Sequence, residues 1–338
     1  MNRLTVVLPL LAALACAGST GSGTDEAGST SGGGGGLSSS SSSSGSGGSS
    51  ASTSSSSSGG GCGGCVVLAS EPQLPWDLTV DATNVYWVNQ ANRTLMKTPK
   101  TGGEATLIIT ATGAPYGIAV DATDAYWTAA TGSISKVPLA GGTRDTLVFG
   151  EDSPVEIAVD DTHVYWAATG VVKRAPKSTG APVTTVASGQ VNPYGVALQG
   201  GYVYWTDYGD GTVKRASVTG SPPDTLASGL GLPYGITTDA THVYWVNNDL
   251  EGSVMKVPLG GGEPETVASA QGNPWAVVVD ETHIYWTNSS TNQVMKASKD
   301  GGEITVLATS LSPSFLAVDE TNVYWTESVA GRVMKAPK

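Results

Sequence analysis

A Tyr-Trp pair recurs at intervals of 39 to 41 residues, and no other feature of the sequence constrains the fold as strongly. Seven of the nine tryptophans stand in this pair, namely Trp87, Trp127, Trp166, Trp205, Trp245, Trp286 and Trp325. Each interval holds four short β-branched or aromatic runs separated by Gly, Pro, Asn and Asp, as at 233–239, 242–246, 253–258 and 265–269. Four short strands in a repeat of about 40 residues are typical of a propeller blade. The sequence therefore predicts an all-β, seven-bladed β-propeller of four-stranded antiparallel blades.

The two ends of the repeat array complement each other. The seventh repeat stops after its third run, at 333–338, and so lacks a fourth strand. The segment 66–70 precedes the first repeat and matches the fourth run of the sixth repeat at 305–309. We expect strand 66–70 to pair with 332–337 in the last blade, so that the ring closes without a free sheet edge.

The recurring Tyr, Trp and Pro positions have a structural explanation. Neighbouring residues of a strand point to opposite faces, and a blade packed between two others buries both faces. We therefore expect both rings of each Tyr-Trp pair to lie in the core. Each first run opens with proline, which is tolerated at strand starts and edges because it lacks an N–H group. This predicts that the proline-led strand is innermost and faces the central channel.

The chain before the repeats divides into a leader and a linker. Residues 1–16 combine a basic start with an apolar stretch at 4–14, which predicts a signal peptide. Residues 13–15 resemble a bacterial lipobox that would make Cys16 a lipidated N-terminus, and ordinary signal peptidase cleavage is the alternative. Residues 17–61 are almost all Ser, Gly, Thr and Ala, which predicts a disordered linker. We expect an outer-membrane or cell-surface lipoprotein, or a secreted or periplasmic protein.

Cys62 and Cys65 form a Cys-Gly-Gly-Cys motif at the start of the domain predicted at 62–338. In an exported protein this spacing predicts a local disulfide. A redox site would need a helix after the first cysteine, and a zinc site would need further ligands. The sequence supplies neither.

The net charge of −12 excludes several partners. Nucleic-acid binding needs a basic surface, and anionic lipid attracts basic segments. The 17 basic and 29 acidic residues provide the opposite balance. We expect no nucleic-acid partner, membrane contact through the lipid anchor only, no cofactor and no metal, and a monomer.

The first two runs of each repeat resemble those of a known propeller family. They follow the pattern Pro-x-Gly-Ile-Ala-Val-Asp and then Val-Tyr-Trp-Thr, as at 115–121 and 125–128. This pattern resembles the YWTD repeats (class B repeats) of low-density lipoprotein receptors and, more loosely, NHL repeats, over residues 75–338. Only 204–207 spells Tyr-Trp-Thr-Asp in full, and YWTD propellers normally have six blades. The resemblance implies a propeller on a bacterial exported lipoprotein, and it implies no ligand.

Several repeated polar positions are interpreted as structural. The three histidines, His163, His242 and His283, share one position that Asn or Asp fills in other repeats, which is typical of a turn. A repeated aspartate opens the same turn. A basic residue recurs on each third run, where rim ion pairs are expected. The acidic loop at 207–211 lacks the spacing of an EF-hand, so calcium binding is not predicted.

Chain direction locates the surface on which we expect a ligand. The connection into each first run and the loop between the second and third runs share one face. Aromatic rings flanked by Asn and Asp on that face suit sugars or peptides. The predicted ligand-binding residues are Trp76, Tyr116, Tyr194, Asp207, Tyr208, Asp210, Tyr234, Asn247, Asp249, Trp275 and Asn288. We predict a surface-exposed or secreted binding module for carbohydrate or peptide that is not an enzyme. The alternatives are a propeller enzyme of the lyase or lactonase type and an envelope scaffold.

Overall fold

The protein is described here by a computed structural model, which describes residues 64–70 and 73–338. The leader, Cys16, the linker and Cys62 lie outside the described residues. Cys65 is disulfide-bonded. The described residues contain no helix whose length and apolarity would let it span a bilayer.

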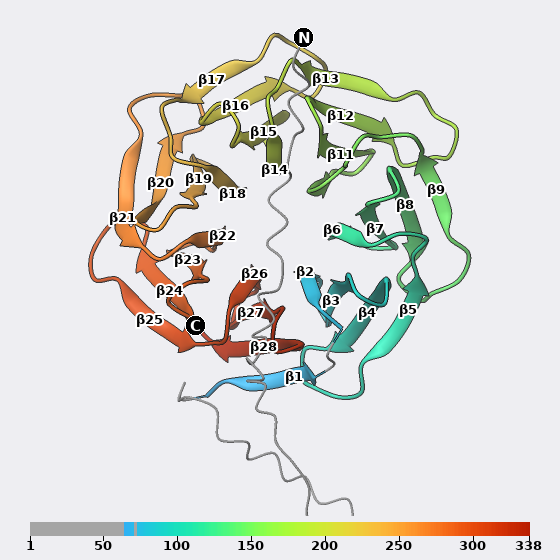
Figure 1. Ribbon diagram of the computed structural model, residues 1–338, viewed down its shortest axis with the longest axis horizontal. Coiled ribbons are helices and arrows are strands. Elements are labelled where there is room, and N and C mark those ends of the chain that lie inside the picture. The colour runs from blue at the N-terminus through green and yellow to red at the C-terminus, as the bar shows by residue number, and fades with distance from the viewer. Residues whose placement is uncertain (1–63, 71–72) are drawn as a thin grey trace, which may run out of the picture. The chain divides into compact units, whose positions relative to one another are not determined.

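Seven four-stranded antiparallel sheets stand in a ring around a central axis (Figure 1). The first three are built from β2 (Pro75–Val80), β3 (Asn84–Asn89), β4 (Thr94–Pro99) and β5 (Thr106–Thr110); β6 (Pro115–Val120), β7 (Asp124–Ala129), β8 (Ser133–Pro138) and β9 (Asp145–Val148); β10 (Ile157–Val159), β11 (His163–Ala168), β12 (Val171–Pro176) and β13 (Thr184–Ser188). The next three are built from β14 (Pro193–Gln199), β15 (Tyr202–Asp207), β16 (Thr212–Ser217) and β17 (Asp224–Ala227); β18 (Pro233–Thr238), β19 (His242–Asn247), β20 (Gly252–Pro258) and β21 (Glu265–Gln271); β22 (Pro274–Val279), β23 (His283–Asn288), β24 (Gln293–Ser298) and β25 (Thr305–Thr309).

The seventh blade closes the ring with both ends of the repeat array. It is built from β26 (Pro313–Val318), β27 (Asn322–Glu327), β28 (Arg332–Pro337) and β1 (Val66–Ser70), in the order β26-β27-β28-β1. Val66 lies opposite Lys335 and Ser70 lies opposite Arg332, with one bulge between Val67 and Ala69. The predicted seven-bladed propeller and its closing strand are confirmed.

The core consists of seven hydrophobic clusters, one in each seam between adjacent blades. Each cluster holds the Tyr of one blade and the Trp of the next, as Tyr204 meets Trp245 and Tyr324 meets Trp87. These seven Trp are at most 1% exposed. The Tyr-Trp pair is therefore the device that joins each blade to both neighbours, as its two-sided burial predicts.

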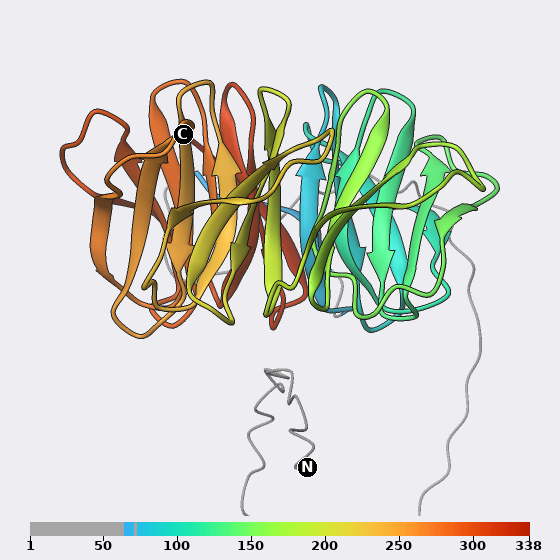
Figure 2. The ribbon, with the colours of Figure 1, turned by 90° about the horizontal axis from the view of Figure 1, so that it is seen from above.

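The strands run between two faces of the ring, which Figure 2 shows from the side. The mouth face carries the connections into each first strand and the loops between second and third strands. The turn face carries the loops between first and second strands and between third and fourth strands, and the C-terminus lies on it. The proline-led strand is innermost in six blades, as expected, while the innermost strand of blade 3 is the shorter β10.

The turn face repeats one hydrogen-bonded knot in six blades. In blade 5, Asp239 Oδ1 accepts the N–H groups of Thr241 and His242 at 2.7 and 2.8 Å, and Oδ2 accepts the Tyr244 hydroxyl at 2.9 Å. The knot fixes the turn that the Asp-x-Thr pattern predicts. The same aspartate position is occupied by Asp81, Asp121, Asp160, Asp280 and Asp319.

A lysine from the following blade completes four of these knots. Lys299 Nζ lies 2.6 Å from Asp239, and three equivalent pairs are Lys100–Asp319, Lys177–Asp121 and Lys338–Asp280. The structural interpretation of the aspartates and histidines is thereby supported. The basic residues of the third strands do more than was expected, because several donate to a backbone carbonyl of the next blade, as Lys97 does to Leu139 at 2.7 Å.

Threonine after the Tyr-Trp pair forms a second link between blades, close to the channel. Thr128 accepts the N–H of Gly117 in its own blade at 2.9 Å and donates its hydroxyl to the carbonyl of Val155 in the next blade. Thr206, Thr287 and Thr326 make the same pair of bonds. In blade 1 this position holds Val88, which cannot form either bond.

Candidate ligand-binding site

The innermost strands line the mouth of the ring at the points where their pairing with the second strands is irregular. In six blades the pairing with the second strand shifts register after the proline, so that two residues lie opposite one. A bulge of this kind re-aims side chains and is common at barrel rims and active sites. The two bulged residues of blade 1 are Trp76 and Asp77, and both belong to its innermost strand.

Six aromatic rings converge at this level and form a continuous arc, which we call the ring mouth: Trp76, Tyr194, Tyr208, Tyr234, Trp275 and Phe315. Tyr234 occupies the middle of the arc, with its centroid 4.0 Å from that of Tyr194 and 4.7 Å from that of Trp275. Trp275 in turn meets Trp76 edge to face at 5.8 Å. Rings from five different blades therefore share one surface.

The ring mouth is neither fully open nor fully buried. Tyr194 and Phe315 are each 8% exposed, whereas Trp76, Tyr208, Tyr234 and Trp275 are half-buried. The indole N–H of Trp275 is buried and has no hydrogen-bond partner among the described residues. A buried donor without a partner costs about 1–3 kcal/mol, so a ligand acceptor at this nitrogen would be favourable.

Two carboxyl groups lie on the axis beside these rings. Asp77 of β2 is 6% exposed, and its carboxylate accepts the N–H of Leu78 at 2.7 Å and that of Ile118 in the next blade at 2.8 Å. The second bond joins blades 1 and 2, where Val88 replaces the threonine link. Glu156 precedes β10 and is half-buried, and its side chain makes no hydrogen bond or ion pair with any other described residue.

Burial raises the pKa of both carboxyl groups. The loss of solvent at Asp77, only partly offset by its two backbone N–H donors, raises the pKa to about 7. Burial and the nearby charge of Asp77 hold the pKa of Glu156 well above its usual range. Glu156 and Asp77 also raise the pKa of Tyr194, after burial and Tyr234. Two carboxyl groups that repel each other in this way keep one proton at pH values at which an exposed pair has lost both protons.

The predicted site residues fall into three groups. Trp76, Tyr194, Tyr208, Tyr234 and Trp275 meet in the ring mouth, whereas Tyr116 is half-buried and contacts no other ring among the described residues. Three predicted polar residues are buried in the blades: Asp207 accepts two backbone N–H groups, Asn247 accepts the N–H of Trp245, and Asn288 bonds to Gln271. Asp210 is exposed and pairs with Lys214, whereas Asp249 is half-buried.

Sequence reasoning did not single out Asp77, Glu156 or Phe315. A signal was present, because this repeat position is glycine in blades 2, 4 and 5. A Cβ on Gly117 would lie 2.8 Å from the carbonyl oxygen of Val155, so the position is normally held small by the neighbouring strand. The position holds glycine in three blades and alanine in a fourth, so the side chains of Asp77, Glu156 and Phe315 depart from the small residues of the other blades.

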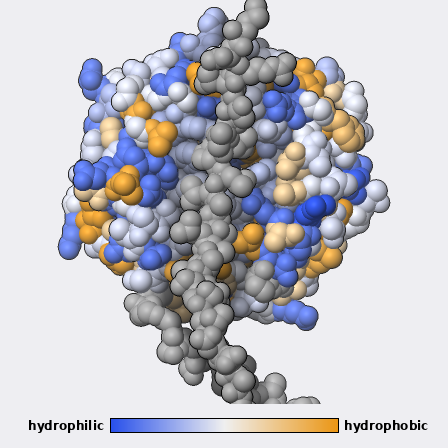
Figure 3. Space-filling model, in the orientation of Figure 1, coloured by the Kyte–Doolittle hydropathy of each residue, from blue (hydrophilic) through white to orange (hydrophobic). Residues whose placement is uncertain are grey.

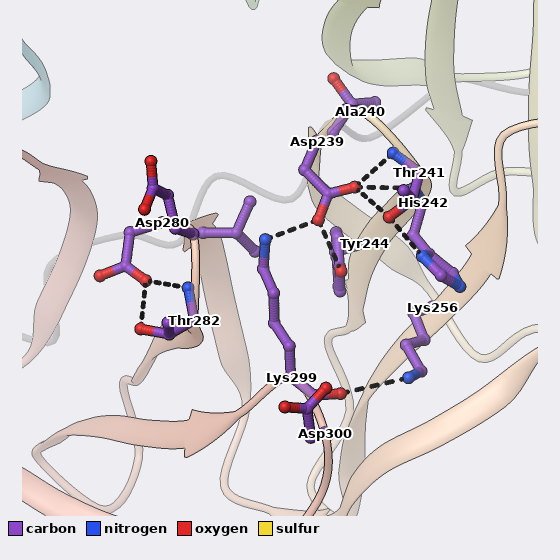
Figure 4. A pocket seen from close by; sticks show the side chains of 13 residues that line it. Asp239, Ala240, Thr241, His242, Tyr244, Lys256, Asp280, Thr282, Lys299 and Asp300 are labelled. Carbon is purple, nitrogen blue, oxygen red and sulfur yellow. Dashed lines mark hydrogen bonds and ion pairs between the residues drawn. The ribbon is translucent and has the colours of Figure 1, made fainter.

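A hollow of about 630 Å³ lies on the turn face between blades 5 and 6 (Figure 4). Asp239, Thr241, His242 and Lys299 line it, and Figure 4 shows Lys299 reaching from one blade to the carboxylate of the other. Asp239 and Asp280 are held by the turn knots, and Lys256 and Lys299 each pair with a carboxylate. No group of three or more potential metal ligands occurs in residues 64–70 and 73–338.

The comparisons with known proteins bear on the fold. No protein-family model and no curated protein matches the chain. Among solved structures it is similar to virginiamycin B lyase from Staphylococcus aureus, with TM-score 0.70 and 12% identity over 81% of this chain and 98% of that one. It is also similar to the WD40 β-propeller domain of Doa1, with TM-score 0.69 and 14% identity over 80% of this chain and 94% of that one. A chain of a nidogen/laminin complex matches with TM-score 0.51 and 24% identity over 58% and 82%.

These neighbours define the class as β-propeller and correct one expectation. The prediction that the chain is not an enzyme is wrong as an inference from its sequence, because structures similar to it over most of their length include streptogramin B lyases. The same fold also occurs in interaction domains, so it is compatible with either kind of function. The resemblance to YWTD or NHL repeats and the lipoprotein assignment stay predictions.

Proposed function

We propose that the protein is an exported interaction module that binds a peptide segment of its partner at the ring mouth. The observation that carries this proposal is the convergence of six rings from five blades around a buried indole N–H without a partner. Rings supply large contact areas, and an unpaired N–H fits a main-chain carbonyl. The cluster lies in an axial mouth, where propellers commonly present ligands.

The surroundings of the ring mouth favour a peptide over a carbohydrate. Seven exposed large apolar side chains belong to loops of the mouth face: Leu74, Phe149, Val191, Leu232, Leu250, Leu311 and Val329. Figure 3 shows hydrophobic patches spread between hydrophilic ones around the ring on this face. These side chains lie on separate loops around the mouth, so an extended peptide that crosses the face could pack against several of them, whereas a sugar would leave most of them without a partner.

A peptide array and a glycan array probed in parallel with the protein test this proposal. We expect selective binding to peptides, and Trp275→Ala should remove it. The matched control is Phe149→Ala, which removes a 76% exposed ring from the same face away from the axis. Binding to glycans alone, or peptide binding that Trp275→Ala leaves intact, would contradict the proposal.

Acid–base catalysis at the same mouth is a second candidate function. Asp77 and Glu156 favour it, because buried carboxyls with raised pKa values are typical general acids and bases. Mass spectrometry of bound ligands before and after incubation separates the two functions. An unchanged ligand supports binding, and a product that Glu156→Gln no longer forms supports catalysis.

Surface display is the last part of the proposal, and it rests on the leader sequence alone. Cys16 would carry the lipid, and the linker at 17–61 would hold the propeller away from the membrane. In cells, Cys16→Ser should release the protein from the membrane fraction into the medium. Retention of the variant in membranes would contradict the anchor.

A further inference from the structure

Asp77 and Glu156 are two carboxyl groups of the mouth face that lack a cation although both are withdrawn from solvent, unlike the exposed Asp152. Other acids of this face are paired: Glu151 with Lys173, Asp207 and Asp210 with Lys214, and Glu327 with Arg332. Neither Asp77 nor Glu156 has a lysine or arginine partner in the described part of the chain. Asp77 is buried and Glu156 is half-buried beside the ring mouth, where a charge without a partner is costly.

The strands packed against β2 bring no compensating charge. On β3 and β27, the hydroxyls of Tyr86 and Tyr324 bond to turn-face aspartates, and Glu327 bonds to Arg332. The remaining neighbours of β2 are β6, whose titratable group is Tyr116, and β26, which carries none. From β14 and β18, Tyr194 and Tyr234 face the carboxyl pair, and burial raises the pKa of each phenol, so both stay neutral.

We infer that Asp77 and Glu156 form a cation subsite at the base of the ring mouth, which takes a lysine or arginine side chain of the bound peptide. The inference rests on the proposed function and specifies its ligand. The rings would contact the methylene stem and favour the cation over their faces. The carboxylates would neutralise its charge, and the indole N–H of Trp275 would donate a hydrogen bond to a carbonyl oxygen of the peptide.

Proton release accompanies binding in this account. The pair holds a proton near neutral pH because burial raises the pKa of Asp77 to about 7. An entering ammonium or guanidinium group favours the charged carboxylates and displaces that proton. Affinity for a cationic peptide should therefore rise as pH increases from 5.5 to 8, whereas affinity for a neutral peptide of the same size should stay constant.

Two synthetic tripeptides test the subsite by calorimetric titration: acetyl-Leu-Lys-Leu-amide and acetyl-Leu-Gln-Leu-amide. At pH 8 we expect the lysine peptide to bind at least about tenfold more tightly, a difference of about 1.4 kcal/mol. Glu156→Gln should abolish this preference and leave the glutamine peptide unaffected. Glu156 is the residue of choice because its side chain supports no hydrogen bond, whereas Asp77 also joins two blades.

Asp152→Asn is the matched control, since it removes an exposed carboxylate from the same face and should leave the preference intact. Equal binding of the two tripeptides, or a lysine preference that survives Glu156→Gln, overturns the cation subsite while the peptide function stands. If neither tripeptide binds and array binding is also absent, the peptide function and the subsite are both overturned.

Discussion

The carboxyl groups on the two faces of this propeller have opposite environments and opposite pKa shifts. On the turn face, Asp239 has two backbone N–H donors, a tyrosine hydroxyl and a lysine from the next blade, and these donors lower its pKa despite the opposing effect of burial. On the mouth face, burial raises the pKa of Asp77 and Glu156. The first arrangement recurs around the ring and stabilises it. The second occurs once, interrupts the repeat, and carries a cost that a ligand could remove.

The largest difference between the faces should appear when a tryptophan is removed from each. Trp245 is fully buried in a seam, so Trp245→Ala should lower the free energy of unfolding by about 3–5 kcal/mol. Trp275 is half-buried and its N–H is unpaired, so Trp275→Ala should cost about 1–2 kcal/mol. Urea denaturation measures both values. Equal losses would mean that the ring mouth is simply a further part of the core.

Replacement of a turn-face aspartate should have the next largest effect on the free energy of unfolding. Asp239→Ala leaves the Tyr244 hydroxyl, two N–H groups and Lys299 without their acceptor. We expect a loss of about 2–3 kcal/mol in the free energy of unfolding. Asp160→Ala is the comparison, because the equivalent knot has no lysine from the following blade, and its loss should be smaller. A larger loss at Asp160 would show that the lysine bridges contribute nothing.

The pH dependence of stability should separate the two sets of carboxyl groups. The turn-face pKa values are lowered, so their stabilisation is present above the unfolded pKa of about 4 and is lost as pH falls below it. The pKa of Asp77 is raised to about 7, so its contribution is present below about pH 4 and is lost as pH rises through 7. The free energy of unfolding should therefore fall by about 1–3 kcal/mol between pH 4.5 and 7.5. A flat profile there would contradict the burial of the pair.

Features that recur in every blade could be predicted from the sequence, whereas features that occur in only one or two blades were missed. Seven Tyr-Trp pairs defined the blades, and the strand 66–70 defined their closure, because each feature follows from burial on both faces of a strand. Four rings of the mouth were found because they directly follow the proline of their repeat, whereas Phe315, one position further on, was missed. Asn247 and Asp207 were placed at the surface, yet they are buried, since hydrogen-bond partners from neighbouring loops cannot be inferred from spacing.

Asp77 and Glu156 could not be paired from the sequence for a related reason. They lie in blades 1 and 3 and are 79 positions apart in the chain, so only the closure of the ring brings them to one axis. Their interaction depends on the curvature of the whole propeller rather than on any local pattern. The enzyme question was misjudged on similar grounds, because the search for catalytic residues followed the histidines, which all belong to turn-face knots.

The stability of Glu156→Gln at pH 8 bears most directly on our claim about the mouth face. The claim is that the carboxyl groups of the mouth face lower the stability of the free protein and serve to bind a ligand. Unfolding in urea would be compared for the unmodified protein and the variant under identical conditions. Glu156 is half-buried, has no cation partner and has a pKa raised by burial, so its replacement by glutamine should leave the variant at least as stable as the unmodified protein, and we expect it to be more stable by about 1 kcal/mol or more. A variant that is less stable by about 1 kcal/mol would show that Glu156 supports the fold, and would contradict the account.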